Sequence, residues 1–220
     1  MIAFFVSGLE RARRAAQHLR DFEDGVDGPF RIFHGMVGDA EIRVFVVEPD
    51  HSAAYAAARI AARRGAKALS PIVDATATPG VASRAGLAPG AIVPVARVWD
   101  LSACGGVMRL LPDSAEEFPV PVDELFPSSP SWKSGDGVAC CTTPLPMRSR
   151  LLARETIRRL GDTIFDGQLT AYAAAAANSG IPLRPAALVT RILTRNGMES
   201  DVPLRVERGI EEMFAGLASR

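Results

Sequence analysis

Cysteine, histidine and net charge are all scarce in this chain, and each shortage excludes a class of function. Three cysteines and three histidines stand among 220 residues. His18, His34 and His51 have no spacing with cysteine or carboxylate residues that is typical of a metal site, so neither a metal nor another cofactor is expected. Lysine plus arginine and aspartate plus glutamate number 25 each, which leaves no basic field to attract nucleic acid or an anionic membrane.

Long apolar runs and common catalytic motifs are missing as well. No apolar run reaches transmembrane length, and the run at 2–6 has no basic segment before it, so no signal peptide is expected. The odd number of cysteines, Cys104, Cys140 and Cys141, favours free thiols in a reducing compartment, which predicts a cytoplasmic protein. The sequence has no nucleophile elbow and no phosphate-binding glycine loop.

The residues that are present predict a single α/β domain over 1–220. Hydrophobic residues make up 48% and charged residues 23%, which is a globular composition. Strand patterns occur at 2–6, 31–37, 41–47, 66–73, 91–98, 138–142 and 185–192, and helix patterns at 9–22, 51–64, 146–160, 168–178 and 203–217. The turn Gly38-Asp39 predicts a hairpin, and strand, helix and strand over 41–73 predict a parallel crossover.

Two stretches interrupt this alternation. A loop is expected at 23–29, after a helix whose arginines, Arg11 among them, are expected on its solvated face. The segment 101–135 holds five prolines and is expected to be irregular. Such a segment is either a binding loop or lid, or is simply mobile.

Three blocks of sequence carry a resemblance to a known family. The first is I-A-F-F-V-S-G-L-E at 2–10. The second spans 51–94 and ends in the turn and strand G-L-A-P-G-A-I-V-P, and the third is Q-L-T-A-Y-A-A-A-A-A-N-S-G-I-P at 168–182. In their order and spacing these blocks resemble the nucleoside phosphorylase and nucleosidase superfamily, which includes the methylthioadenosine nucleosidases.

The resemblance implies a single domain with a mixed, partly closed β-sheet flanked by helices. Members of the superfamily cleave the glycosidic bond of a nucleoside with water or phosphate, and dimers, trimers and hexamers are common among them. The resemblance therefore implies a nucleoside or purine-like ligand, phosphate as an open second ligand, and a homo-oligomer.

Two catalytic positions of the superfamily differ here. The glutamate that lies near the ribose falls at Gln168, which keeps hydrogen-bonding groups but loses the negative charge that favours a cationic ribose. The aspartate that lies near the base is expected at the end of the strand 185–192, where Arg191 or Arg195 replaces it. An arginine is always charged and cannot act as a general acid.

The small-residue loop of the superfamily corresponds to 72–80. It includes Asp74, which places a negative charge where some phosphorylases receive phosphate. Phosphorolysis is therefore disfavoured unless a nearby arginine offsets the charge, the candidates being Arg43, Arg84, Arg191 and Arg195.

Two carboxylates are left as candidate catalytic residues, Glu10 and Asp74. Glu10 is equally well explained as an acidic residue in the first turn of a helix. The expected ligand-binding residues are Ser7, Gly8, Thr76, Thr143, Asp166, Gln168 and Arg191. Asp166 is equally well explained as an N-cap with Gln168 in the first helical turn, and a buried Arg191 would need Asp74 or Asp166 as its partner.

Two functions follow from these residues. The chain is a divergent nucleoside phosphorylase-like or nucleosidase-like protein that binds a nucleoside or purine-like ligand and cleaves an N-glycosidic bond if Glu10 or Asp74 suffices. The alternative is a non-catalytic binding or scaffold protein that retains the fold.

Overall fold

A computed structural model describes residues 1–85, 88–100, 116–119, 138–142, 163–194, 197–200 and 203–218. The helix expected at 146–160, most of the segment 101–135 and Thr143 lie outside these residues.

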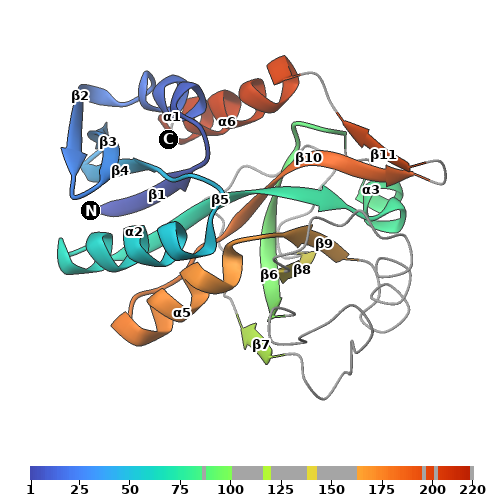
Figure 1. Cartoon of the computed structure of the whole chain (residues 1–220). Helices are drawn as coiled ribbons and strands as arrows, with labels where there is room; N and C mark the ends of the chain where they lie inside the picture. Colours follow the sequence, from blue (N-terminus) through green and yellow to red (C-terminus); the bar gives the residue numbers. More distant parts are fainter. Residues whose placement is uncertain are drawn as a thin grey trace.

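One mixed β-sheet forms the centre of the molecule (Figure 1). Its strands are β1 (Ile2–Val6), β2 (Arg20–Asp27), β3 (Phe30–Val37), β4 (Ala40–Val46), β5 (Ala68–Ala77), β6 (Ile92–Asp100), β7 (Glu116–Pro119), β8 (Val138–Thr142), β9 (Thr163–Asp166), β10 (Ala186–Thr194) and β11 (Gly197–Ser200). The strand order is β11-β10-β6-β8-β9-β5-β1-β4-β3-β2, with β7 beside β6. Because β10 also pairs with β5, the strands β5, β10, β6, β8 and β9 close into a ring, and β1, β4, β3 and β2 extend from β5 as an open sheet. The expected partly closed sheet is confirmed.

The expected parallel crossover is also confirmed. β1 lies between β4 and β5 and pairs in parallel with both, and α2 (His51–Arg63) connects β4 to β5. Asp50 caps α2 by accepting a hydrogen bond from the Ala53 amide at 2.8 Å. Gly65 follows the helix with a φ of +82°, a left-handed conformation that glycine adopts without strain.

Helices cover both faces of the sheet (Figure 1). One apolar core contains buried residues of α1 (Leu9–Ala16) and α6 (Pro203–Ala218), and another contains those of α2 and α5 (Leu169–Ser179). A short helix, α3 (Pro79–Ala85), follows β5. None of the helices in the described part combines the length and apolarity that a membrane span needs.

Successive side chains of β5 alternate between the two faces. Val73, Ala75 and Ala77 belong to the core under α2 and α5, whereas Ile72 belongs to the core under α1 and α6. The alternation of a β-strand therefore directs the even-numbered residues that follow Ile72 toward the α1 and α6 face.

Two expectations for the first forty residues are wrong. The helix expected at 9–22 ends at Ala16, and most of the loop expected at 23–29 belongs to β2. Asp21, with a φ of +54°, lies in the irregular start of β2 between Arg20 and Glu23, and Phe22 packs against Phe33 of β3 with ring centroids 5.6 Å apart. β2 is a polar edge strand without a hydrophobic alternation, so its residues do not indicate a strand by themselves. Its extended conformation comes from antiparallel pairing with β3.

A close backbone contact seats α6 on the turn before β6. The Gly90 amide donates to the Val189 carbonyl of β10 at 2.7 Å, which holds the turn against the sheet. A Cβ atom at Gly209 would lie 2.0 Å from the Gly90 carbonyl oxygen. Only glycine fits at position 209 without a shift of the backbone. Gly209 of α6 therefore packs directly against Gly90 in the A-P-G-A turn.

We expect Gly209→Ala to destabilise the protein. Alanine normally stabilises a helix interior relative to glycine, but here its methyl group must push α6 away from Gly90, and overpacking of this kind costs about 1–3 kcal/mol. Thermal unfolding measures the change, at about 2–4 °C per kcal/mol for a chain of this size. Gly25→Ala is the matched control, since its Cβ would meet only Ile32 at an ordinary 3.7 Å. A Gly209→Ala variant as stable as the parent would contradict the close contact.

Candidate functional site

The expected site residues gather at one edge of the sheet. β1, β4, β5 and β10 run parallel to one another, so their carboxyl ends share that edge, where α/β proteins commonly bind ligands. Ser7 and Gly8 follow β1, Asp74 and Thr76 lie in the second half of β5, and Arg191 lies late in β10. Gly8 has a φ of +89° and turns the chain from β1 into α1. We call this the carboxyl edge.

Strand alternation divides these residues between the two faces of the sheet. Asp74 and Thr76 point with Ile72 toward the α1 and α6 face, and Arg191 is in register with Thr76 and shares its side. Ser7 continues the alternation of Ala3 and Phe5, which belong to the core under α2 and α5. The carboxyl edge therefore presents two polar groups. Asp74, Thr76 and Arg191 lie on the α1 and α6 face, and Ser7 lies on the α2 and α5 face.

Asp74 is held by an arginine of the first helix. Nη1 of Arg11 donates to both carboxylate oxygens of Asp74, at 2.7 and 2.9 Å. The side chains are 24% exposed for Arg11 and 34% exposed for Asp74, so the pair borders solvent. The sequence did not predict that Arg11 pairs with Asp74. The one sequence signal for this contact is the position of Arg11 in the first turn of the helix that follows Gly8.

Arg191 needs Asp74 or Asp166 as its partner only if it is buried. Its side chain is exposed, so it needs no buried partner, and Asp74 pairs with Arg11 instead. Arg43, another candidate for offsetting the charge of Asp74, donates to Glu41 at 2.9 Å. Arg195 and the side chain of Arg84 lie outside the described residues.

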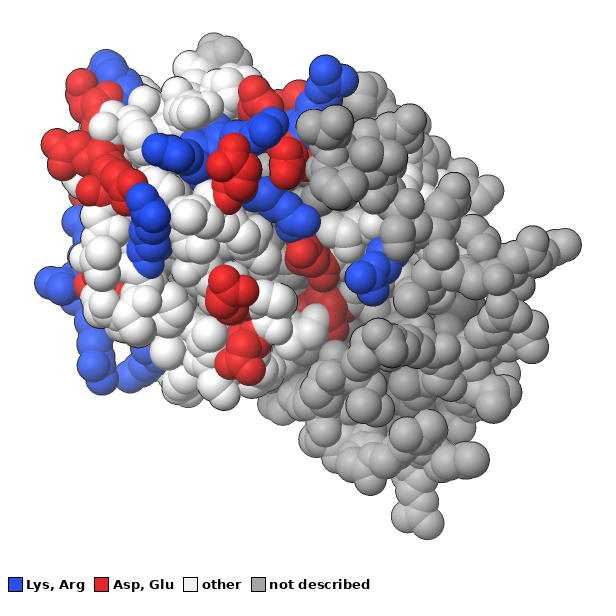
Figure 2. Space-filling model, turned by 45° about the horizontal axis from the view of Figure 1, so that its top comes forward, with Lys and Arg blue, Asp and Glu red and all other residues white. Residues whose placement is uncertain are grey.

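Glu10 lies on the outer surface of α1. Its side chain is 61% exposed and accepts a hydrogen bond from Arg14 at 3.3 Å, and Arg14 also contacts Glu207 of α6 at 3.3 Å. Figure 2 shows acidic and basic side chains interleaved on this face of the described residues, with no large area of one sign. The position fits the interpretation of Glu10 as an acidic first-turn residue.

Asp166 is buried and organises the start of α5. Its Oδ1 accepts hydrogen bonds from the Gln168 and Leu169 amides, at 2.5 and 2.6 Å. The helix itself begins at Leu169 with Gln168 as its N-cap residue, so the expected arrangement of an Asp166 N-cap and Gln168 in the first turn is wrong by two residues. Burial, and secondarily the Asp166 carboxylate, raise the pKa of Tyr172 far above its ordinary value, which keeps that hydroxyl neutral.

Gln168 joins α5 to the loop between β4 and α2. Its side chain amide donates to the carbonyl oxygens of Glu48 at 2.9 Å and Asp50 at 3.4 Å. The residue is only 4% exposed. An ionised carboxylate cannot donate to a carbonyl, so this position is built for an amide.

A further buried polar group lies just past β5. Thr78 is fully buried, and its hydroxyl has no hydrogen-bond partner among the described residues. Its carbonyl accepts from the Ala82 amide at 3.0 Å and so begins α3. No group of three or more histidine, cysteine, aspartate or glutamate residues in the described ranges could hold a metal ion.

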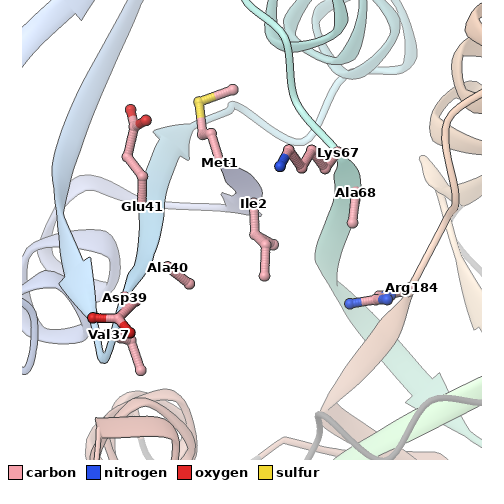
Figure 3. Close-up of a pocket in the computed structure, with 9 residues that line it drawn as sticks. All are labelled: Met1, Ile2, Val37, Asp39, Ala40, Glu41, Lys67, Ala68 and Arg184. Atoms are coloured by element: carbon pink, nitrogen blue, oxygen red, sulfur yellow. The ribbon is translucent and has the colours of Figure 1, made fainter.

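A hollow of about 770 Å³ lies elsewhere, at the opposite edge of the sheet (Figure 3). It is lined by residues at the amino ends of β1 and β5, by the turn between β3 and β4, and by Arg184 before β10. The carboxyl edge and this hollow are therefore separate features of the molecule.

Comparison with known proteins identifies the fold. No family model matches the chain, and no curated protein matches it. Solved structures match along almost its whole length. The 5′-methylthioadenosine/S-adenosylhomocysteine nucleosidase of S. pneumoniae, with a transition-state inhibitor bound, is 15% identical, with a TM-score of 0.68 over 100% of this chain and 96% of that one.

Two other structures match equally well. Futalosine hydrolase of Helicobacter pylori is 12% identical, with a TM-score of 0.69 over 99% of this chain and 94% of that one. The 5′-methylthioadenosine/S-adenosylhomocysteine nucleosidase of Colwellia psychrerythraea, in complex with adenine, is 17% identical, with a TM-score of 0.67 over 100% and 91%. The architecture that the resemblance implied is thus confirmed, and this chain has the same fold as these nucleosidases and the futalosine hydrolase.

Proposed function

We propose that this protein binds a nucleoside or another purine-like ligand at the carboxyl edge. The fold supports this proposal, because structures of the same architecture hold adenine and a transition-state inhibitor of a nucleosidase. The two polar groups of the edge support it as well. Arg11 and Asp74 offer donors and acceptors beside solvent on one face, and Oε1 of Gln168 is a neutral acceptor on the other.

We further propose that the protein binds its ligand without cleaving it, and the environment of Gln168 carries this conclusion. Cleavage of an N-glycosidic bond passes through a cationic ribose, which a nearby negative charge stabilises more than it stabilises the substrate. The Gln168 amide is neutral and is committed to two backbone carbonyls. It can orient a ribose hydroxyl through Oε1, but it supplies no charge to the transition state.

The accessible carboxylate of Asp74 favours a second candidate function, N-glycosidic cleavage. Asp74 is one-third exposed at the edge where a ligand would lie, so it can reach water or a ribose hydroxyl. Its ion pair with Arg11 opposes this role, because the guanidinium neutralises the charge that would polarise water or stabilise the ribose cation. Arg11 would equally favour phosphate as a second ligand, so phosphate is included in the test.

A panel of purine nucleosides, incubated with and without phosphate, tests the two functions. We expect binding of adenine or a nucleoside by calorimetry and no release of free base by chromatography. We also expect Asp74→Asn to weaken binding about tenfold or more, because it removes a charged acceptor.

Asp24→Asn is the matched control for this experiment. Asp24 of the edge strand β2 pairs with Arg31 of β3, away from the carboxyl edge, so this variant should leave binding unchanged. Base release that Asp74→Asn abolishes would establish cleavage instead. Absence of both binding and release across the panel would refute the proposed function.

We expect Gln168→Glu to destabilise the protein and not to create activity. The new carboxylate would face the carbonyl oxygens of Glu48 and Asp50, and an unmatched buried polar group costs about 1–3 kcal/mol. A protonated carboxyl can donate, so the pKa of the introduced group is raised in the folded state. The loss of stability should therefore be larger at pH 8 than at pH 5.

Thermal unfolding at the two pH values measures this loss. Gln17→Glu, the same change at an exposed position after α1, should have little effect at either pH. A Gln168→Glu variant that keeps the parental stability at pH 8 and releases base would show instead that the position accepts a catalytic carboxylate.

A further inference from the structure

The loop 47–50 between β4 and α2 lies at the carboxyl edge, beside the residues that follow β1. Val46 at the end of β4 is in register with Val6 at the end of β1, and the Val47 amide donates to the Val6 carbonyl at 3.1 Å. Glu48 therefore lies beside the turn from β1 into α1. The loop thus borders the edge at which the ligand is proposed to bind.

Hydrogen bonds constrain the backbone of this loop. The side chain amide of Gln168 donates to the carbonyls of Glu48 and Asp50, and the start of α5 accordingly lies next to the start of α2 (Figure 1). The Asp50 amide also donates to the Glu48 carbonyl at 2.7 Å, and the Asp50 carboxylate caps α2. Pro49 between them has a restricted φ. A loop constrained in this way loses little conformational freedom when a ligand binds.

The side chain of Glu48 is left available by these contacts, which use only its backbone carbonyl. It is exposed, and no ion pair engages it within the described residues. Three other carboxylates of the edge are engaged. Asp74 pairs with Arg11, Asp166 accepts from backbone amides at the start of α5, and Asp50 accepts from the first turn of α2. Glu48 is therefore an anionic acceptor that a ligand can use, on a constrained backbone.

The ribose is the part of a nucleoside that presents two neighbouring hydroxyl donors, and an ionised carboxylate can accept from both with its two oxygens. We propose that Glu48 binds the ribose hydroxyls of the ligand and so selects a ribonucleoside over a deoxynucleoside or a free base, with Gln168 as the positioning residue that holds its backbone. This inference rests on the proposed binding of a nucleoside at the carboxyl edge. It requires no cleavage, because departure of the base also needs a proton donor, which Arg191 cannot supply.

Calorimetry with adenosine, 2′-deoxyadenosine and adenine tests the role of Glu48. The parent should bind adenosine at least about tenfold more tightly than the other two compounds, because each of them lacks a hydroxyl that donates to a charged acceptor. Glu48→Ala removes the carboxylate and leaves the backbone carbonyl in place. It should abolish this preference and leave the Kd for adenine unchanged. Glu212→Ala, which removes an exposed carboxylate of α6, is the matched control and should keep the preference.

Gln168→Met tests the positioning role, because it removes the amide donors at a similar side chain volume. This variant should also lose the preference for adenosine while it keeps the affinity for adenine, a pattern that a general loss of folding does not produce. A Gln168→Met variant that keeps the preference would overturn the positioning role.

The outcomes separate this inference from the function on which it rests. If the parent binds all three compounds equally, or if Glu48→Ala keeps the preference for adenosine, the inference is overturned and the proposed binding function stands. If the parent binds none of the three compounds, both are overturned.

Discussion

The placement of β5 is the constraint on which the rest of the molecule depends. This strand belongs both to the closed ring and to the open sheet, since it pairs with β1, β9 and β10. It is covered by helices on both faces, so the alternation of its side chains sends one set into each core. The same alternation continues to its carboxyl end, where polar residues replace apolar ones. The division of the carboxyl edge into two polar groups is therefore a direct consequence of strand geometry.

The chemistry of the carboxyl edge follows from which charges are already paired. Arg11 engages Asp74, the backbone amides of Gln168 and Leu169 engage Asp166, and the side chain of Gln168 engages two carbonyls. Each of these contacts stabilises the link between a helix and the sheet. They also leave the charge of Asp74 neutralised by Arg11. The polar residues of this edge serve the packing of α1, α2 and α5, which is why we propose binding and not cleavage.

The two edges of the sheet have different physical characters. At the carboxyl edge, Asp74 forms an ion pair with Arg11, and the buried Asp166 accepts hydrogen bonds from backbone amides. At the amino edge, Lys67 and Asp39 lie unpaired on either side of an apolar floor, as far as the structure describes the chain. The two ends of the strands therefore differ in how far their charges are paired within the chain.

Local patterns in the sequence were enough to predict the elements whose signals are strong. β1, the β3–β4 hairpin, α2, β8 and the end of α5 at Gly180 all have clear periodicity or a glycine with positive φ. β2 could not be predicted, because a polar edge strand owes its form to β3 and not to its own residues. The resemblance in the sequence aligned Gln168 with a glutamate of the superfamily. Only the tertiary structure decided which groups the Gln168 side chain binds. Contacts such as Arg11 with Asp74 and Gln168 with Glu48 join residues 63 and 120 positions apart, and a partner so distant is selected by the packing of the whole sheet, which no local pattern contains.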